Sequence, residues 1–483
     1  MTHLPARTAA LACALLLLAA CSGPPEPSAP ATRDVGVQMF QWTWDSLAAE
    51  CTDSLGPAGY GWVLTSPPQE HVVGEAWWTA YQPVSYRVES RLGTREEYAA
   101  MVETCHDAGV DVWADAVVNH MTGQDAPGTG WAGSSYSHYE YPGLYSEADF
   151  HHCGLTPNDD IALYQDARQV QTCELVNLAD LATETENVRA TVVAYLQDLL
   201  SLGVDGFRID AAKHMAPEDV AAIVAELPEG TGIAQEVIRG TGEPVTPEQY
   251  LDNGMVYEFA YGKELQGVIA ASPGRLLELG SSSRFVPSDD AVVFVDNHDT
   301  ERNGSTLGYA DADQYALATV LMLAGTYGTP AVYSGYAFSD RDAGPPQDGS
   351  GRVLDASCTA EAAPRAELAD GDRVCQHRWP QVAGMVGWRN VVGDAPMVDT
   401  WSDGDAVAVG RGELGLVVVN LGEEPLAATL DTSLPDGRYC DVLGQPVMSG
   451  EPCPGAEVRV QDGAVEVRVP ALTAHAFHVA ARP

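Results

Sequence analysis

The sequence predicts an α/β chain built on a (β/α)8 TIM barrel, with a subdomain inserted after strand 3 and a C-terminal antiparallel β-sandwich. Three observations predict this fold class. Short apolar, β-branched runs recur eight times between residues 35 and 336, helical patterns lie between several of them, and short alternating strands follow from about residue 390. Near-continuous apolar strands that alternate with helices are typical of a parallel sheet, and eight of them favour a closed barrel.

The eight expected strands are the runs 35–40, 61–65, 110–117, 204–209, 232–235, 255–259, 291–295 and 331–334. Helical spacing is clear in residues 95–108, where Tyr98, Met101, Val102 and Cys105 share one face. A second helix is expected over 187–202, from a capping Asn187 to the residue before Gly203. A third is expected over 217–227, with Pro217 in its first turn.

The gap between the third and fourth strands, from about residue 120 to 202, is too long for one crossover. It is rich in Gly, Tyr, His and Asp and shows little helical period before its end, so an inserted subdomain is expected. Alternating runs at 406–419, 438–442, 457–460 and 464–469 indicate the sandwich. We therefore assign 34–119 and 183–390 to the barrel, 120–182 to the insertion and 391–483 to the sandwich.

Residues 1–21 are typical of an export signal, with Arg7 ahead of an apolar run from 9 to 20. The run is too short to span a bilayer comfortably. Residues 18–21 resemble a bacterial lipobox, in which Cys21 would be lipidated; the alternative is a plain signal peptide cut nearby. Residues 22–33 are expected to form a linker. We therefore expect an exported, extracellular protein whose only membrane attachment would be a lipid on Cys21.

Composition excludes one class of function. The formal charge of −43 opposes sequence-independent nucleic-acid binding, because phosphates would be repelled. An acidic surface is compatible with a neutral polysaccharide, but a soluble secreted surface tuned by genome composition or a salty habitat explains it better. Apart from Cys13 and Cys21 the chain has eight cysteines, an even number that suggests disulfides in an exported protein but leaves the pairing open.

Three acidic residues follow expected strands: Asp210 after the fourth, Glu236 after the fifth and Asp299 beyond the seventh. The chemistry of a barrel lies at the carboxyl ends of its strands. Any single acid there could be a helix N-cap, which is the commoner role. Three together, each flanked by Arg, His or Asn, indicate a catalytic centre.

Four segments carry a specific resemblance: DAVVNH at 115–120, GFRIDAAKH at 206–214, QEVI at 235–238 and FVDNHD at 294–299. In order and placement they resemble the four conserved regions of the α-amylase superfamily of glycoside hydrolases. The stretches LGPAGYGWVLTSPP and WWTAYQPVSY resemble the animal and actinobacterial α-amylases in particular. The resemblance implies an exported α-amylase that cleaves internal α-1,4-glucosidic bonds of starch, glycogen or maltooligosaccharides, with retention, and acts as a monomer.

The resemblance implies that Asp210 is the nucleophile, Glu236 the general acid/base, and Asp299 the residue that binds sugar hydroxyls and stabilises the transition state. Two carboxyls with different protonation states are what a retaining glycosidase needs. Arg208, two residues before Asp210 on the same strand face, would hold Asp210 ionised, whereas a neutral Glu236 would need desolvation or a nearby negative charge. The implied substrate contacts are Trp77, Trp78, Tyr81, Gln82, His120, Tyr164, Arg208, Lys213, His214, Ile238 and His298.

The resemblance also implies a structural calcium ion, held by the side chains of Asn119 and Asp180 and the carbonyls of Gln171 and His214. These ligands come from both the barrel and the insertion, so the ion would clamp the two together.

Animal-type relatives bind chloride near the catalytic acid. Arg208 and Asn297 match two of its ligands, but Ala331 replaces the basic third, so little or no chloride activation is expected. The disulfides that the resemblance implies are Cys51–Cys105, Cys153–Cys173, Cys358–Cys375 and Cys440–Cys453.

Two alternatives remain open at this stage. A maltooligosaccharide-forming or transglycosylating enzyme of the same superfamily would share all three carboxylates and differ in its loops. A glucan-binding lipoprotein without catalytic activity would be expected to have lost those acids, and here Asp210, Glu236 and Asp299 are all present.

Overall fold

The computed structural model describes residues 1, 33–271, 273–281, 284–358, 363–445, 447–448 and 451–483. The expected export signal, Cys21 and nearly all of the linker lie outside the described residues. Within the described part of the chain, no helix is both long enough and apolar enough to cross a bilayer.

A closed barrel of eight parallel strands confirms the predicted fold class. The strands follow one another around it in the order β1-β10-β9-β8-β7-β6-β3-β2. They are β1 (Gly36–Met39), β2 (Trp62–Thr65), β3 (Asp111–Ala116), β6 (Gly206–Ile209), β7 (Gly232–Gln235), β8 (Met255–Tyr257), β9 (Ala291–Val293) and β10 (Thr329–Ser334). Most of their residues are buried, which explains why they appear in the sequence as nearly continuous apolar runs.

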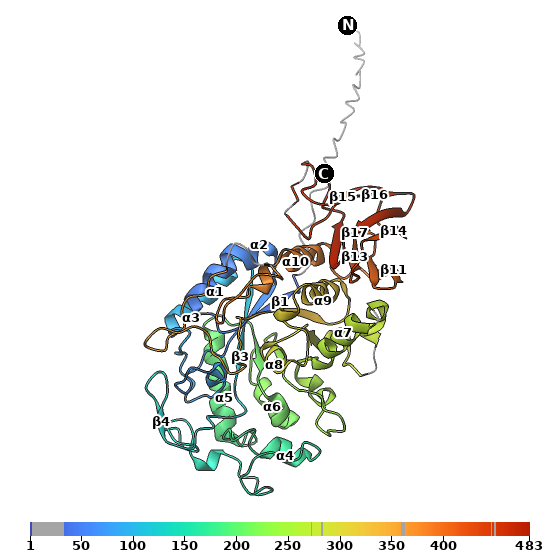
Figure 1. Ribbon diagram of the computed structural model, residues 1–483. Coiled ribbons are helices and arrows are strands. Elements are labelled where there is room, and N and C mark those ends of the chain that lie inside the picture. The colour runs from blue at the N-terminus through green and yellow to red at the C-terminus, as the bar shows by residue number, and fades with distance from the viewer. Residues whose placement is uncertain (2–32, 272, 282–283, 359–362, 446, 449–450) are drawn as a thin grey trace. The chain divides into compact units, whose positions relative to one another are not determined.

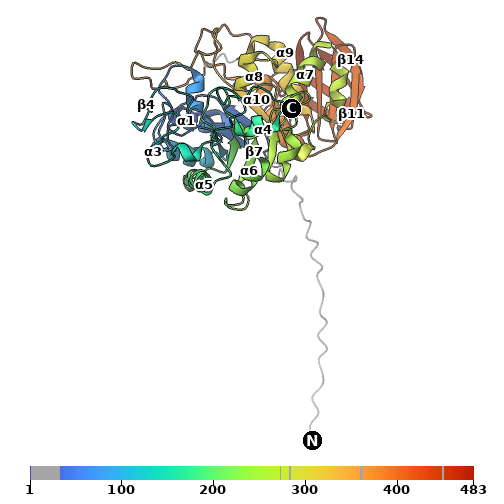
Figure 2. The same ribbon diagram turned by 90° about the horizontal axis from the view of Figure 1, so that it is seen from below.

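Helices surround these strands, as Figures 1 and 2 show from two directions. They are α1 (Trp44–Glu50), α2 (Gly56–Ala58), α3 (Arg95–Asp107), α5 (Glu186–Ser201), α6 (Pro217–Val224), α7 (Phe259–Ala271), α8 (His298–Asn303), α9 (Asp313–Ala324) and α10 (Pro380–Val392). The face predicted for α3 is the buried one, and Thr94 and Glu97 form a capping box at its start.

Three predicted boundaries are wrong. Helix α5 begins at Glu186 after Thr185, and the Asn187 side chain donates to Asp149 instead of capping the helix. Helix α6 ends at Val224, three residues before the expected end. Phe259 belongs to α7 and not to a strand, because the Glu258 carboxylate accepts from the Ala260 N–H and starts the helix there.

The insertion between β3 and α5 contains little regular structure. It consists of the short strands β4 (Gly128–Thr129) and β5 (Ser135–Tyr136), the 3-10 helix η3 (Glu147–Asp149), the helix α4 (Ala167–Thr172) and long loops. Figure 1 shows β4 and α4 together at one end of the barrel. Backbone bridges join His120 to Asp180 and Phe150 to Leu181, so the two ends of the segment are paired.

Two four-stranded antiparallel sheets form the C-terminal part, in the orders β11-β12-β13-β18 and β14-β17-β16-β15. Their strands are β11 (Met397–Asp403), β12 (Ala406–Arg411), β13 (Gly415–Asn420), β14 (Leu426–Asp431), β15 (Gly437–Cys440), β16 (Glu457–Gln461), β17 (Ala464–Val469) and β18 (Thr473–His478). Both sheets contribute to one apolar cluster that includes Leu416, Tyr439 and Phe477. The prediction of a sandwich is thus confirmed.

The run 406–419, predicted as one strand, is in fact the hairpin of β12 and β13. The turn is short: Gly412 and the exposed Glu413 are its polar positions, between two strands whose residues are all buried. Helix α10 runs across the predicted domain boundary at 391, and Trp388 donates from Nε1 to the Phe477 carbonyl at 2.9 Å.

All four implied disulfides are present: Cys51–Cys105, Cys153–Cys173, Cys358–Cys375 and Cys440–Cys453. The second closes the insertion next to α4.

Candidate active site

A cleft of about 510 Å³ opens where the barrel strands end. Its walls come from segments far apart in the sequence, which follow β2, β6, β7 and β9 or belong to the insertion. The lining residues are Trp77, Trp78, Tyr81, His120, Tyr164, Leu175, Leu178, Asp210, Ala211, Lys213, His214, Glu236, Ile238, Gly240, Glu243, His298, Asp299 and Asn303. All three predicted carboxylates are therefore in one cleft, together with nine of the eleven expected substrate contacts; the two outside the lining are Arg208 and Gln82.

Arg208 lies beneath the cleft and connects three carboxylates. Its Nη1 donates to Asp115 Oδ1 at 2.6 Å and to Asp210 Oδ1 at 2.8 Å, and its Nη2 lies 2.9 Å from Glu236 Oε1. Arg208 lies opposite Asp115 in the register of β3 and β6. Asp210 comes two residues later, just after the end of β6, so the side chains of Asp115, Arg208 and Asp210 point to the same side. Sequence reasoning missed Asp115, because the register that pairs it with Arg208 is not visible in the sequence.

The backbone after β6 is strained in a way that serves Glu236. Ala211 has φ 49° and ψ 28°, the left-handed region that a residue with a Cβ adopts at a cost. In this conformation its N–H donates to Glu236 Oε2 at 2.9 Å. Lys213 N donates to the Glu236 carbonyl at 3.1 Å, so the turn after β6 is fixed to the end of β7.

Burial raises the pKa of Asp210 above its ordinary value, and the Arg208 guanidinium opposes that rise. Arg208 thus favours the ionised form of Asp210 as expected, but burial outweighs it. Burial also raises the pKa of Glu236; Arg208 lowers it, and the charge of Asp210 raises it further. The side chain of Asp299 is 34% exposed, and its pKa is raised by desolvation in the cleft and then by Glu236.

Aromatic rings form one wall of the cleft. Tyr81 stacks on His298 with centroids 5.0 Å apart, and Trp77 meets the same imidazole edge-on at 5.5 Å. Trp78 is 37% exposed, so its ring is available to a ligand. The Tyr81 hydroxyl donates to Asp115 Oδ2 at 2.8 Å, which holds this ring against the group around Arg208.

The opposite wall contains the lysine of the GFRIDAAKH motif. Lys213 Nζ donates to Glu243 Oε2 at 2.5 Å and to the Ile238 carbonyl at 2.8 Å, and it lies 5.2 Å from the centroid of the Tyr164 ring. Glu243 was missed by sequence reasoning, since it lies beyond the conserved QEVI segment. Gln82 is engaged elsewhere: its Oε1 accepts hydrogen bonds from the segment 122–124.

Leu175 and Leu178 enter the cleft on a tight turn that sequence reasoning also missed. Leu178 N donates to the Leu175 carbonyl at 3.1 Å, and the two residues between them, Val176 and Asn177, have φ of 55° and 63°. Positive φ is unusual for valine, a β-branched residue, so the turn must be held by its surroundings.

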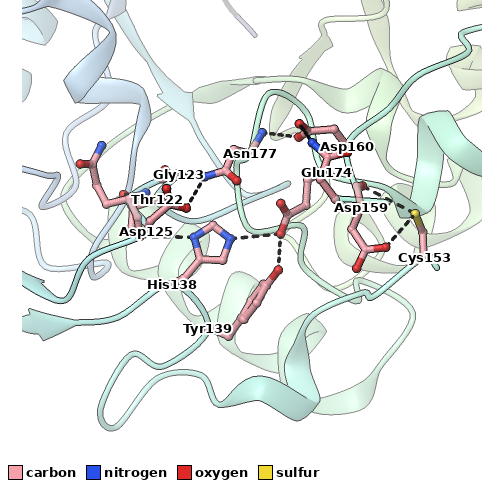
Figure 3. Close-up of polar contacts among 12 residues, drawn as sticks. Thr122, Gly123, Asp125, His138, Tyr139, Cys153, Asp159, Asp160, Glu174 and Asn177 are labelled. Carbon is pink, nitrogen blue, oxygen red and sulfur yellow. Dashed lines mark hydrogen bonds and ion pairs between the residues drawn. The ribbon is translucent and has the colours of Figure 1, made fainter. Parts of the chain in front are cut away.

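Figure 3 shows the contacts that hold this turn. Glu174 Oε1 accepts from the Tyr139 hydroxyl at 2.7 Å and lies 3.2 Å from His138 Nε2. Asn177 donates from its backbone to Asp160 at 2.6 Å and from Nδ2 to the Gly123 carbonyl at 2.8 Å. The insertion therefore fixes one lip of the cleft.

The residues expected to bind calcium offer oxygen donors. Asn119 Oδ1 is buried and accepts no hydrogen bond from any described residue, which leaves a carbonyl-type oxygen free for a hard cation. A backbone bridge pairs Asp180 with His120, the residue after Asn119. Asp180 is also buried, and its Oδ2 lies 2.7 Å from His151 Nδ1. Helix α4, which carries Gln171, packs on the 3-10 helix η4 (Ala212–His214). The donor set fits calcium.

The two residues expected to match chloride ligands, Arg208 and Asn297, already have partners within the protein. Asn297 Oδ1 accepts from the Asp299 and Thr300 N–H groups and caps α8. Ala331 lies in a small apolar cluster that includes Trp62 and Tyr257. The only cation of the expected set is Arg208, which already faces three carboxylates.

Comparison with known proteins gives concordant matches. The family model for the α-amylase catalytic domain matches residues 65–259, and that for the α-amylase C-terminal all-β domain matches residues 401–480. The chain is 46% identical to an α-amylase of Streptomyces violaceus over 443 residues, covering 90% of this chain and 74% of that protein. It is 39% identical to an α-amylase of Tenebrio molitor over 449 residues, covering 89% and 93%.

Among solved structures, wild-type α-amylase I from Eisenia fetida is similar with a TM-score of 0.85 and 34% identity, covering 93% of this chain and 98% of that one. A mutant of the Eisenia enzyme in complex with maltohexaose is equally similar.

Proposed function

This chain belongs to the α-amylase family of glycoside hydrolases and is a glycoside hydrolase of α-amylase type; we propose that it cleaves internal α-1,4-glucosidic bonds of starch and glycogen through Asp210, Glu236 and Asp299. The observation that carries this proposal is that the three carboxylates line one cleft while Arg208 connects the first two. Relatives that match 90% and 89% of the chain support it.

The proposed reaction has two steps. In the first, Asp210 attacks the anomeric carbon while Glu236 gives its proton to the glycosidic oxygen, so that the C–O bond breaks and a glycosyl ester forms. In the second, Glu236 takes a proton from water, which attacks the ester carbon and releases Asp210. The configuration at the anomeric carbon is retained.

The environment of each acid supports its role. Arg208 lies 2.8 Å from Asp210 Oδ1 and favours its carboxylate form, as a nucleophile requires. Glu236 is buried and next to Asp210, two conditions that favour its protonated form. Asp299 reaches the cleft from the first turn of α8 and is more exposed, which suits a side chain that binds sugar hydroxyls.

The aromatic wall supports a sugar chain as substrate. The flat, apolar face of a glucose ring packs well on tryptophan or tyrosine, and Trp77, Trp78 and Tyr81 offer such faces beside the three acids. Lys213, His214, Tyr164 and Ile238 would contact the leaving-group side. The cleft binds maltooligosaccharides in this proposal, in line with the maltohexaose complex of the Eisenia enzyme.

We further propose that calcium is held by Asn119, Asp180 and the carbonyls of Gln171 and His214. The ion would join the insertion, which carries Gln171 and Asp180, to the barrel segment that follows β6, and so stabilise the cleft. We also propose that the enzyme is a monomer with little or no chloride activation, and that it is exported with a lipid on Cys21. Its domains in this proposal are the barrel (34–119 and 183–390), the insertion (120–182) and the sandwich (391–483).

The product profile on starch tests the endo-acting mechanism. Incubation with soluble starch should give a ladder of oligosaccharides by chromatography, and the first products should have the α configuration by NMR. A single short product would favour the maltooligosaccharide-forming alternative, and products longer than the substrate would favour transglycosylation. Absence of hydrolysis by the folded, calcium-loaded protein would refute the proposal.

A further inference from the structure

Arg302, in the last turn of α8, has an unusual environment for an arginine. Its side chain is 4% exposed, and the carbon of its guanidinium lies within 5.5 Å of four ring centroids. The distances are 4.4 Å to Phe338, 4.9 Å to Tyr336, 5.1 Å to Phe40 and 5.5 Å to Trp77. The guanidinium is thus enclosed by an aromatic cage.

Besides the cage, Arg302 has one ionic partner, the buried carboxylate of Glu301. The nearest carboxylate oxygen of an ion pair is Glu301 Oε2, 3.7 Å from Arg302 Nη1, which is beyond hydrogen-bond distance. Among the described residues, none of the three guanidinium nitrogens meets an acceptor in good hydrogen-bond geometry. A buried charge without hydrogen bonds is costly, and cation–π attraction from several rings offsets part of that cost. Such an arrangement is costly to maintain for packing alone, because an apolar side chain would fill the same space.

Two rings of the cage also contact His298, the histidine of FVDNHD in the cleft. Phe40 stacks on the imidazole at 5.0 Å, and Trp77, itself a cleft residue, meets it edge-on at 5.5 Å. Arg302 therefore lies directly behind a layer of rings whose other side faces the substrate.

His298 is held in one protonation state by its neighbours. Gln38 Nε2, from β1, lies 3.1 Å from His298 Nδ1, and His298 Nε2 faces Asp299 Oδ2 at 3.6 Å. When Gln38 Nε2 donates to Nδ1, the single proton of the neutral imidazole is on Nε2. Burial lowers the pKa of His298 well below its usual value, and the positive charges of Arg208 on β6 and Arg302 on α8 lower it further. A second proton on Nδ1 would require the Gln38 amide to turn so that its oxygen accepts the hydrogen bond.

We propose that Arg302 is a positioning residue for the hydrolysis: its flat guanidinium fixes Phe40 and Trp77, and its charge keeps His298 neutral with Nε2–H directed to the sugar. The inference rests on the proposed function, because it assigns Arg302 a part in that same reaction. It predicts that the charge and the planar shape of Arg302 have separable effects on activity.

Two substitutions separate them. Arg302→Met keeps the stem and removes the charge, so the acid limb of the pH profile of kcat/KM should move to higher pH. We expect the acid limb to move up by at most about one pH unit and the activity above pH 7 to change by less than about threefold, since one pKa unit corresponds to a tenfold change. Arg302→Lys keeps the charge but loses the planar group, so the acid limb should stay while KM for maltooligosaccharides rises about three- to tenfold.

Arg373 provides a matched control. It is also a buried arginine over aromatic rings, 5.2 Å from Trp42 and 5.5 Å from Tyr336, but it donates to the carbonyls of Phe40 and Gln41. Arg373→Met should lower the thermal midpoint without moving the acid limb.

The proposal is overturned if Arg302→Met leaves the acid limb unchanged, or if Arg373→Met moves it equally. Should Arg302→Met fail to fold, Arg302→Lys decides: a shifted acid limb or an unchanged KM refutes the inference. Starch hydrolysis by the unaltered enzyme is measured first, so that failure of the proposed function, which would abolish it, is distinguished from failure of this inference.

Discussion

Replacement of Glu236 by glutamine would separate the chemical role of this side chain from its place in the fold. One carboxylate oxygen accepts from the Ala211 N–H donor at 2.9 Å, and the other lies 2.9 Å from the Arg208 Nη2 donor in an ion pair. Glutamine has one acceptor oxygen, so its amide group must face one of these donors, at a cost of about 1–3 kcal/mol. Removal of a buried carboxylate with a raised pKa offsets part of that cost. The variant should therefore fold, with a net loss of no more than ~3 kcal/mol.

Activity should fall far more than stability. A general acid contributes about 10²–10⁴ to the rate, so kcat on maltooligosaccharides should drop by about a hundredfold to ten-thousandfold. A maltosyl fluoride loses fluoride without a proton, and azide attacks the glycosyl ester without a general base. With both present, Glu236→Gln should recover to within about a hundredfold of the unaltered enzyme, measured as glycosyl azide formed.

Asp210→Asn is the matched isosteric control, because it removes the nucleophile and should not be rescued by the same reagents. Binding of maltohexaose, measured by calorimetry, should persist in both variants. Starch hydrolysis by Glu236→Gln within tenfold of normal would refute the acid/base assignment. A failure of fluoride and azide to separate the two variants would refute it as well.

Three further predictions follow from the same structure. A chelator should lower both the thermal midpoint and starch hydrolysis, and added calcium should restore them. Asn119→Ala should need a much higher calcium concentration for the same recovery. No response of the unaltered protein to the chelator would refute the metal site. Glu50 lies in α1 and is buried, which raises its pKa, but hydrogen bonds from His377 and Arg378 outweigh burial and lower it to about 2 from 4.5. Its ionised form should therefore contribute about 3 kcal/mol to the free energy of unfolding above pH 4.5, and this contribution is lost as the pH falls toward 2. In denaturant titrations, Glu50→Gln should be less stable than the unaltered protein at about pH 7, and the two should converge near pH 2. Chloride added to chloride-free enzyme should not raise activity several-fold, whereas Ala331→Arg should create some chloride response in the same assay.

Much of the barrel was predictable because parallel strands buried on both faces appear as uninterrupted apolar runs. The boundaries that failed were decided by single local contacts. Glu258 starts α7 through its bond to the Ala260 N–H, and only three residues, 412–414, separate the fully buried strands β12 and β13. Such contacts depend on side-chain geometry and leave little periodic signal in a sequence.

The sequence by itself determined the fold class, through its recurring apolar runs, and the three acids and most of the aromatic wall, through residue types within short motifs. It left the cysteine pairing open, and the four pairs came from the family resemblance. Only the tertiary structure decided which distant residues meet. The register between β3 and β6 places Asp115 opposite Arg208, the turn at 175–178 enters the cleft from the insertion, and the cage of Arg302 gathers Phe40, Trp77, Tyr336 and Phe338 from three parts of the chain. The physical reason is that Glu236 and its neighbours owe their charge states to burial and to charges across the barrel, and these distances exist only when the barrel is closed.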